Sequence, residues 1–250
     1  MNKFFDYPLS CPEKSISPNL SNPDLAKRLK ALEAVYRHYD QAHSKTDLAC
    51  HAGCSTCCTR NVTLTSIEAI HILNGCENQH ASLHSRLSEV MQEPRFIPAM
   101  TTNRLSELCQ TNQDIPHEPL PESSLPCPFL ENDRCLIYSV RPFACRCMNS
   151  FSSCHKTGFA EQSEWMVALN TLYLQLIEHL DCNGWSGNLI DLVWNLTVQP
   201  LDPETSSRRL VKNRPIQTLV IPPEYRGRIS PVIQELWGII SPAVCGHYPP

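Results

Sequence analysis

Residues 50–58 read CHAGCSTCC, and residues 127–147 read CPFLENDRCLIYSVRPFACRC. These two stretches hold eight of the 14 cysteines in the chain, and eleven of the 14 lie between Cys50 and Cys154. Clustering on this scale requires a local cause, which is either a set of disulfides or a metal site. The choice between the two depends on the compartment in which the protein works.

The beginning of the chain favours a reducing compartment. Residues 1–8 read MNKFFDYP, in which Asp6 and Pro8 interrupt any apolar run of the length found in a signal peptide. No stretch approaches the ~18 apolar residues of a membrane span. We therefore expect a cytoplasmic protein without a membrane partner, whose thiols stay reduced. Cysteine clusters in that compartment are more often metal-binding or catalytic than disulfide-bonded.

Composition excludes several other classes of protein. The chain has 250 residues, 8 glycines, 21 prolines and a net charge of −4. It is long enough to bury a core without disulfides. No two glycines are separated by a single residue, and none begins a P-loop, so the common dinucleotide and nucleotide fingerprints are absent. The charge argues against a basic nucleic-acid binder, and we expect no nucleic-acid partner.

Hydrophobic periodicity predicts a mainly α protein in which cysteine-rich, metal-binding loops lie between helices. The longest pattern predicts a helix over 23–43, with Asn22 as its cap and Pro23 at its first position. Thr65 and Glu68 form a capping box before a helix over 66–74. Further helices are expected near 79–92, 98–110, 161–182, 189–196 and 231–240, with a short strand at 219–221.

This pattern divides the chain into three parts. Residues 1–22 are polar and proline-punctuated and are expected to form an extended arm. Residues 23–198 form the helical cysteine-cluster domain, with its cluster at 50–155. Residues 199–250 form a proline-rich C-terminal extension with a short helix.

The spacing of the cysteines predicts thiolate ligands for zinc or iron, the iron being present as an ion or as an iron–sulfur cluster. Two cysteines separated by two or three residues can face one ion, and zinc sites and iron–sulfur clusters each take four such ligands. Cys57 and Cys58 are adjacent, so they either face two sites or leave one thiol spare; one site or two remain open. Eight ligands are predicted: Cys50, Cys54, Cys57, Cys58, Cys127, Cys135, Cys145 and Cys154.

Several residues near these eight cysteines are further candidates for ligands or for charge compensation. Cys147 is a ninth candidate, and the remaining five cysteines are expected to be bystanders. His51 and His155 adjoin cysteines, but solvated or hydrogen-bonded histidines are the more common outcome. His71 and His179 are expected to be helix-surface or satisfied boundary residues. Two arginines, Arg141 and Arg146, flank Cys145 and are suited to neutralising thiolates, the alternative being an ion pair with Asp133 or Glu131.

These motifs resemble the YkgJ-type cysteine-cluster family, which is associated with zinc or iron chelation through a CxxCxxCC motif. The resemblance covers roughly 50–155 and includes the Cys-Pro pair at 127–128, Tyr138, and the Arg-Pro pair at 141–142. Cys154 is similar to an additional cysteine in one branch of the family. Two departures are a first gap of three residues and the extra Cys147.

The resemblance and the spacing leave three functions open. The first is a metal-binding protein whose ion is structural or stored. The second is an iron–sulfur or metal-dependent enzyme, because the family also includes the longer flagellin lysine N-methylases. The third is a metal-delivery or redox-sensing protein, which requires an exposed, labile site. The expected partner in each case is a metal ion, and no catalytic residue is assigned.

Overall fold

A computed structural model describes residues 23–43, 46–51, 53–119, 125–198 and 209–244, and these residues are mainly helical. The expected N-terminal arm at 1–22 lies outside the described residues, as do Cys11, Cys245 and the start of the proline-rich extension. Within the described residues, no helix has the length and apolar character needed to cross a membrane.

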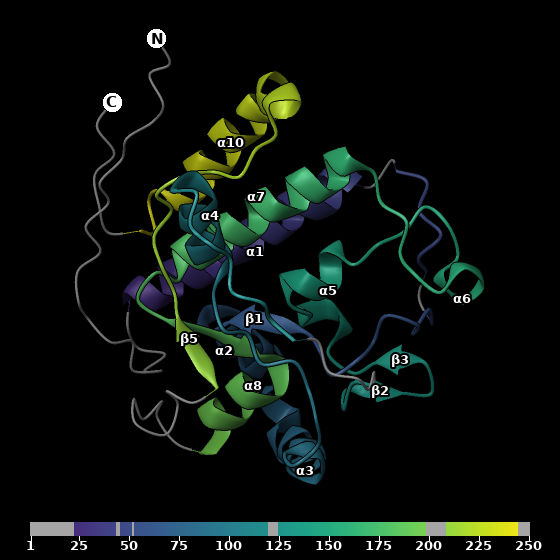
Figure 1. The fold of residues 1–250 in the computed structure, drawn as a ribbon. Coiled ribbons are helices and arrows are strands. Elements are labelled where there is room, and N and C mark those ends of the chain that lie inside the picture. Colours follow the sequence, from purple (N-terminus) through teal and green to yellow (C-terminus); the bar gives the residue numbers. More distant parts are fainter. Residues whose placement is uncertain (1–22, 44–45, 52, 120–124, 199–208, 245–250) are drawn as a thin grey trace.

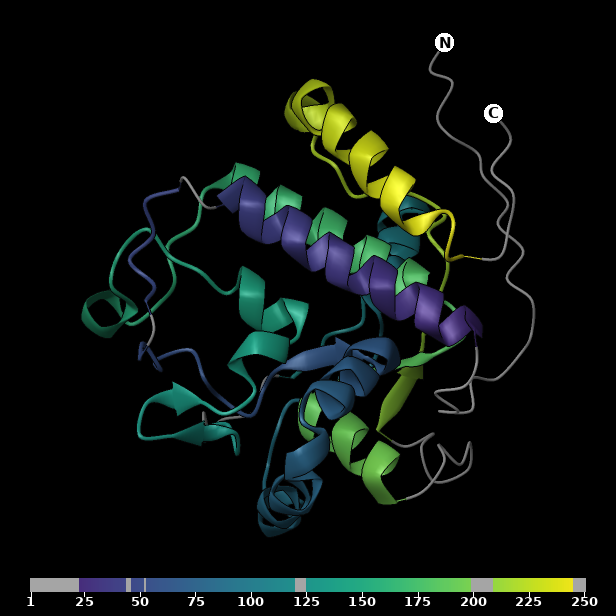
Figure 2. The ribbon, with the colours of Figure 1, turned by 180° about the vertical axis from the view of Figure 1, so that it is seen from behind.

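Three long helices form one layer of the molecule. Helix α1 (Pro23–His43) lies alongside α7 (Glu164–Leu180), and α10 (Arg226–Ile240) packs against both (Figures 1 and 2). Leu32, Val35 and Tyr36 of α1 recur at helical spacing and face the core together with Leu172 of α7 and Leu236 of α10. Residues of α10 therefore share the main hydrophobic core, so this helix packs as part of the helical layer.

A small antiparallel sheet lies beside this layer, in the strand order β1-β4-β5. Strand β1 (Thr63–Thr65) pairs with β4 (Trp185–Asn188), and β4 pairs with β5 (Leu210–Lys212). Helix α2 (Ser66–Gly75) follows β1 directly, and α8 (Leu189–Val198) follows β4. These two helices and α3 (His80–Val90) enclose a second hydrophobic core.

Buried polar contacts join the layers. The guanidinium of Arg95, in the segment after α3, binds both carboxylate oxygens of Asp191 on α8 at 2.9 and 2.7 Å. Helix α4 (Thr102–Gln110) is capped by Thr101 and packs on α7. At its start, the backbone N–H of Asn103 donates to buried Glu178 at 2.8 Å. Each contact gives a buried polar or charged group a hydrogen-bond partner in place of water.

Short 3₁₀ turns complete the path of the chain at Glu77–Gln79 (η1), Tyr138–Val140 (η2) and Pro223–Tyr225 (η3). Between α4 and α7 the chain forms the hairpin strands β2 (Leu130–Glu131) and β3 (Arg134–Cys135) and the short helices α5 (Phe143–Cys147) and α6 (Cys154–Thr157). These short elements were not predicted, and they carry most of the second cysteine group.

The expected strand at 219–221 is wrong. The N–H of Val220 donates to the side chain of Gln175 on α7 at 2.9 Å, and the N–H of Ile221 donates to the carbonyl of Leu219. These donors are thus satisfied without a β-ladder, and the third strand is β5 instead. The last helix begins at Arg226, five residues before the predicted start, and includes Pro231.

Candidate metal centre

The eight predicted ligands lie on four segments that meet on one side of the molecule. These segments are the loop after α1, the β2–β3 hairpin with the residues that lead into it, helix α5, and helix α6. Figures 1 and 2 show α6 and the β2–β3 hairpin on the side of the molecule on which α1 ends, with α5 further in. The fold therefore places on one side of the molecule cysteines that the sequence separates by as many as 104 residues.

Backbone hydrogen bonds hold the first cysteine group against the second. The N–H of Cys127 donates to the carbonyl of Cys58 at 2.9 Å. An isolated β-bridge joins Thr59 to Pro126 beside it, and the N–H of Arg60 donates to the carbonyl of Leu125 at 2.9 Å. This two-stranded contact places Cys58 next to Cys127.

The β2–β3 hairpin carries Cys135 back towards Cys127. Its turn residues Asn132 and Asp133 have φ values of 48° and 60°, in the left-handed region that the turn of a two-residue hairpin requires and that Asn and Asp tolerate. Leu130 pairs with Cys135 across the hairpin, and the N–H of Leu130 donates to the carbonyl of Cys127 at 3.0 Å. The residues of this turn thus set the position of Cys135 relative to Cys127.

Helix α5 is anchored by a buried carboxylate. The N–H of Phe143, at the start of α5, donates to Oε1 of Glu68 at 2.7 Å. The same oxygen accepts from the hydroxyl of Tyr36 at 2.8 Å, and Oε2 accepts from the N–H of Thr65 at 2.8 Å. Glu68 therefore joins α1, α2 and α5, and it fixes the helix that carries Cys145.

The remaining predicted ligands, Cys50, Cys54, Cys57 and Cys154, lie on the loop after α1 and on α6. The N–H of Ala49 donates to the carbonyl of Ser150 at 2.9 Å, which brings the Cys50 segment against the segment leading to α6. Cys154 begins α6, and Gly158 ends it with a φ of 80° and an N–H that donates to the carbonyl of Cys154. Cys50 and Cys57 are exposed, whereas Cys54 and Cys154 are half-buried.

The thiols form one connected electrostatic group. Burial raises the pKa of the Cys145 thiol, and the thiols of Cys127 and Cys135 raise it further. Burial also raises the pKa of Cys127 to about 11. The Cys58 thiol donates a hydrogen bond to Cys57, which lowers the pKa of Cys57 and raises that of Cys58. Several thiolates cannot share this space without a compensating cation, which a bound metal ion would supply.

The two predicted arginines take different positions. Arg141 stacks over the ring of Tyr138 at 3.8 Å, and its charge interacts favourably with the thiolates of Cys57 and Cys135. Arg146 instead pairs with Asp40 of α1 at 2.9 Å. The alternative ion pair with Asp133 or Glu131 is not observed, because Glu131 pairs with Arg86 and Asp133 accepts from Ser55.

The other cysteines lie in varied surroundings. Cys76 is buried in the second core, and Cys109 is exposed on α4. Cys147 is half-buried, and its thiol donates to the carbonyl of Ala144 at 3.5 Å. Cys182 is disulfide-bonded, which the argument from a reducing compartment did not predict.

The histidines are not uniformly surface residues. His155 is exposed on α6, and Nδ1 of His71 lies 3.8 Å from Glu33. His179 is buried, and its Nε2 has no hydrogen-bond partner, so the expectation of a satisfied boundary residue is wrong there. Its Nδ1 accepts from the N–H of Ile216 at 3.2 Å.

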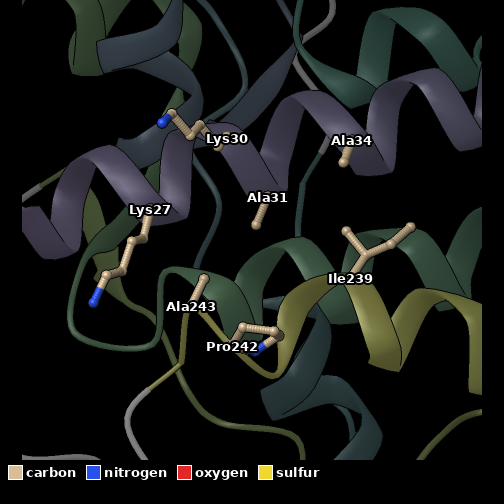
Figure 3. A pocket seen from close by; sticks show the side chains of 7 residues that line it. All are labelled: Lys27, Lys30, Ala31, Ala34, Ile239, Pro242 and Ala243. Carbon is tan, nitrogen blue, oxygen red and sulfur yellow. The ribbon is translucent and has the colours of Figure 1, made fainter.

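A shallow pocket of about 490 Å³ lies apart from the thiols, between α1 and α10 (Figure 3). It lies along α1 before the end from which the cysteine loop departs. The residues that line it are mostly apolar, with two lysines at one end: Lys27, Lys30, Ala31, Ala34, Ile239, Pro242 and Ala243.

The donor set suits zinc or iron, because soft thiolates prefer these metals to hard cations. Among the described residues, no group of three or more histidine, cysteine, aspartate or glutamate side chains is already arranged to hold a metal ion. Binding would therefore need the thiols to lose protons and move closer together. Comparison with family models, curated proteins and solved structures found no match. The resemblance to the YkgJ-type family stays a prediction.

Proposed function

We propose that this protein binds zinc or iron through the thiolates of Cys50, Cys54, Cys57, Cys58, Cys127, Cys135, Cys145 and Cys154. The observation that carries the proposal is the backbone pairing that brings the first cysteine group against the second, with the N–H of Cys127 bonded to the carbonyl of Cys58. Electrostatic interactions among the thiols of these groups support it. The metal acts as a structural or stored ion, because it would tie together segments that lie far apart in the sequence.

The second support is the local chemistry. Neighbouring thiolates repel each other, and burial penalises each one, so a divalent cation that lowers their pKa values binds in exchange for protons. Arg141 lies close enough to interact with Cys57 and Cys135 and would offset the residual negative charge of thiolates bound to a divalent ion.

The test is anaerobic purification of the full chain, followed by elemental analysis and a visible spectrum. Colourless protein with near-integral zinc supports a zinc site, and brown protein with iron and acid-labile sulfide supports an iron–sulfur cluster. The variants Cys57→Ser and Cys135→Ser should each lower the bound metal and the melting temperature together.

Cys109→Ser is the matched control, because Cys109 is exposed on α4 and lies outside the cluster. Its metal content and melting temperature should equal those of the wild type. Wild-type protein without metal, or unchanged metal content in both cluster variants, would contradict the proposal.

A further inference from the structure

We propose that Tyr173 is a redox-active tyrosine that protects the chain against one-electron oxidation. In this step Tyr173 gives one electron to a thiyl radical, its O–H bond breaks, and the proton passes to Nδ1 of His38. The products are a thiolate, a neutral tyrosyl radical and an imidazolium. The residues involved lie outside the cysteine cluster, and the step needs no bound metal.

A chain of two hydrogen bonds links three helices at this site. The hydroxyl of Tyr173 on α7 lies 2.6 Å from Nδ1 of His38 on α1. Nε2 of His38 lies 2.9 Å from Oε2 of Glu235 on α10. These three helices form the layer shown in Figures 1 and 2. The chain runs from the core, where Tyr173 is 0% exposed, to the surface, where the side chain of Glu235 is 66% exposed.

The three partners fix the position of each proton. A carboxylate only accepts hydrogen bonds, so Nε2 of His38 carries the proton that is donated to Glu235. In the neutral imidazole Nδ1 is then unprotonated, and it accepts from the hydroxyl of Tyr173. Burial raises the pKa of Tyr173, which keeps its hydroxyl protonated at neutral pH. The phenol is thus bonded to an imidazole nitrogen that can take its proton.

The oxidation of a buried phenol requires such a base. Removing an electron alone would leave a cation in the apolar core, at a large cost in desolvation. When the proton leaves at the same time to a base within hydrogen-bond reach, the tyrosine stays neutral. The positive charge then lies on His38, where the carboxylate of Glu235 stabilises it.

Tyr39 lies in the same core but has different partners. Its hydroxyl donates to the side-chain amide of Asn170 at 2.8 Å and accepts from the side-chain amide of Asn149 at 3.1 Å. An amide oxygen is a much weaker base than an imidazole nitrogen, so neither contact takes up the proton of Tyr39. Its oxidation is therefore less favourable than that of Tyr173.

Tyr36 has a carboxylate partner, but its charged neighbours disfavour oxidation. Its hydroxyl donates to Oε1 of Glu68 at 2.8 Å, and that oxygen already accepts a second hydrogen bond from the N–H of Phe143. The guanidinium of Arg146 lies over its ring, 4.2 Å from the ring centroid. A cation at this distance opposes the loss of an electron from the ring. Of these three core tyrosines, Tyr173 is thus the easiest to oxidise.

Aromatic rings join Tyr173 to the helix that carries two cysteines. Its ring stacks on Phe143 with centroids 5.3 Å apart, and it meets the ring of Tyr39 edge-on at 5.0 Å. Phe143 begins α5, on which Cys145 and Cys147 lie, and Cys147 packs against the same core. A thiyl radical is the one-electron oxidation product of such a thiol. The packed rings give an electron a short path from Tyr173 to α5, and they keep water away from the tyrosyl radical.

The test uses the full chain, purified anaerobically, with a photo-oxidised ruthenium tris-bipyridine complex as the one-electron oxidant. The wild type should form a long-lived neutral tyrosyl radical, detected by transient visible absorption and by electron paramagnetic resonance. The radical should form more slowly in D₂O, because the proton moves with the electron. Glutathiyl radicals, made by pulse radiolysis of glutathione, should produce the same tyrosyl radical.

Four variants assign the radical to its site. Tyr173→Phe keeps the ring and should abolish the long-lived radical, whereas Tyr39→Phe, the matched control, should keep it. His38→Gln retains a hydrogen-bond acceptor for Tyr173 but removes the base, so it should slow radical formation by about 100-fold or more. Glu235→Gln should also slow radical formation while leaving the melting temperature nearly unchanged, because the Glu235 side chain is exposed.

Each outcome supports or overturns this assignment. Equal radical yield and lifetime in the wild type and Tyr173→Phe would overturn it, as would wild-type kinetics in His38→Gln. If Tyr173→Phe fails to fold, His38→Gln and the comparison in D₂O still decide the question. A radical that the ruthenium complex produces and glutathiyl radicals do not would overturn the thiyl radical as the oxidant.

Discussion

Replacing Glu68 should most clearly show how the helical core supports the segment that carries the second cysteine group. The variant Glu68→Gln keeps the size of the side chain but replaces one carboxylate oxygen by an amide nitrogen. Each oxygen of Glu68 accepts two hydrogen bonds: Oε1 from Tyr36 and Phe143, and Oε2 from the backbone N–H and the hydroxyl of Thr65. Either orientation of the amide therefore points its nitrogen at a backbone N–H donor.

The expected loss of stability follows from these hydrogen bonds. A hydrogen bond to a charged group contributes about 1.5–3 kcal/mol, and a buried donor left without a partner costs about 1–3 kcal/mol. Since Glu68 is 3% exposed, water cannot replace the lost acceptor. We expect Glu68→Gln to lower the free energy of unfolding by about 3 kcal/mol. For a chain of this size, that corresponds to a fall of about 6–12 °C in melting temperature.

Urea denaturation followed by circular dichroism, under anaerobic and reducing conditions, measures this loss. Glu33→Gln is the control, because the Glu33 side chain is 48% exposed and its contacts with Arg37 and His71 are 4.0 and 3.8 Å long. It should change stability by less than about 1 kcal/mol. If the two variants are equally stable, Glu68 does not join α1, α2 and α5 in the way described.

Three further predictions concern other parts of the fold. Arg95→Met removes the bidentate partner of buried Asp191 and should lower the free energy of unfolding by about 3–5 kcal/mol in urea denaturation; a loss below about 1 kcal/mol would show that the pair is dispensable. Gly184→Ala places a Cβ against buried side chains and should cost about 1–3 kcal/mol, whereas Gly238→Ala in α10 has open space and should gain about 0.5–1 kcal/mol; equal melting temperatures would refute this contrast. Burial raises the pKa of Glu178 from 4.5 to about 7, so the folded state keeps a proton that the unfolded state releases; stability should fall as pH rises between these values, and Glu178→Gln should reduce that slope.

The sequence could predict the long helices because their hydrophobic period is sustained over several turns. The pattern of α1 matches its bounds at Pro23 and His43, and α7 shows the same regularity. The strands are only two to four residues long, which is too short for alternation to be visible. Strand β4 contains Gly187 and Asn188, residues that are rare in strands, and only its pairing with β1 and β5 makes it one.

The sequence offers candidate ligands for the site but not their arrangement in space. The spacing of the cysteines predicts eight candidate thiols, whereas their arrangement depends on contacts such as that of Cys127 with Cys58, which no local pattern specifies. The capping box predicted the local bond from Thr65 to Glu68. It could not predict that the second oxygen of Glu68 reaches Tyr36 and Phe143, since those contacts depend on the packing of distant helices.

The hydrogen bond between Cys58 and Cys127 also has a consequence for the order in which the protein is made. The two residues are 69 positions apart, so translation at roughly 5–20 residues per second separates their synthesis by about 3–14 s. During this interval the four thiols of residues 50–58 have been synthesised, but Cys127, Cys135 and Cys145 have not. The nascent chain therefore passes through a stage in which these thiols are open to oxidation or to the wrong metal. A metal ion bound by both cysteine groups could be loaded only after α5, which carries Cys145, has left the ribosome.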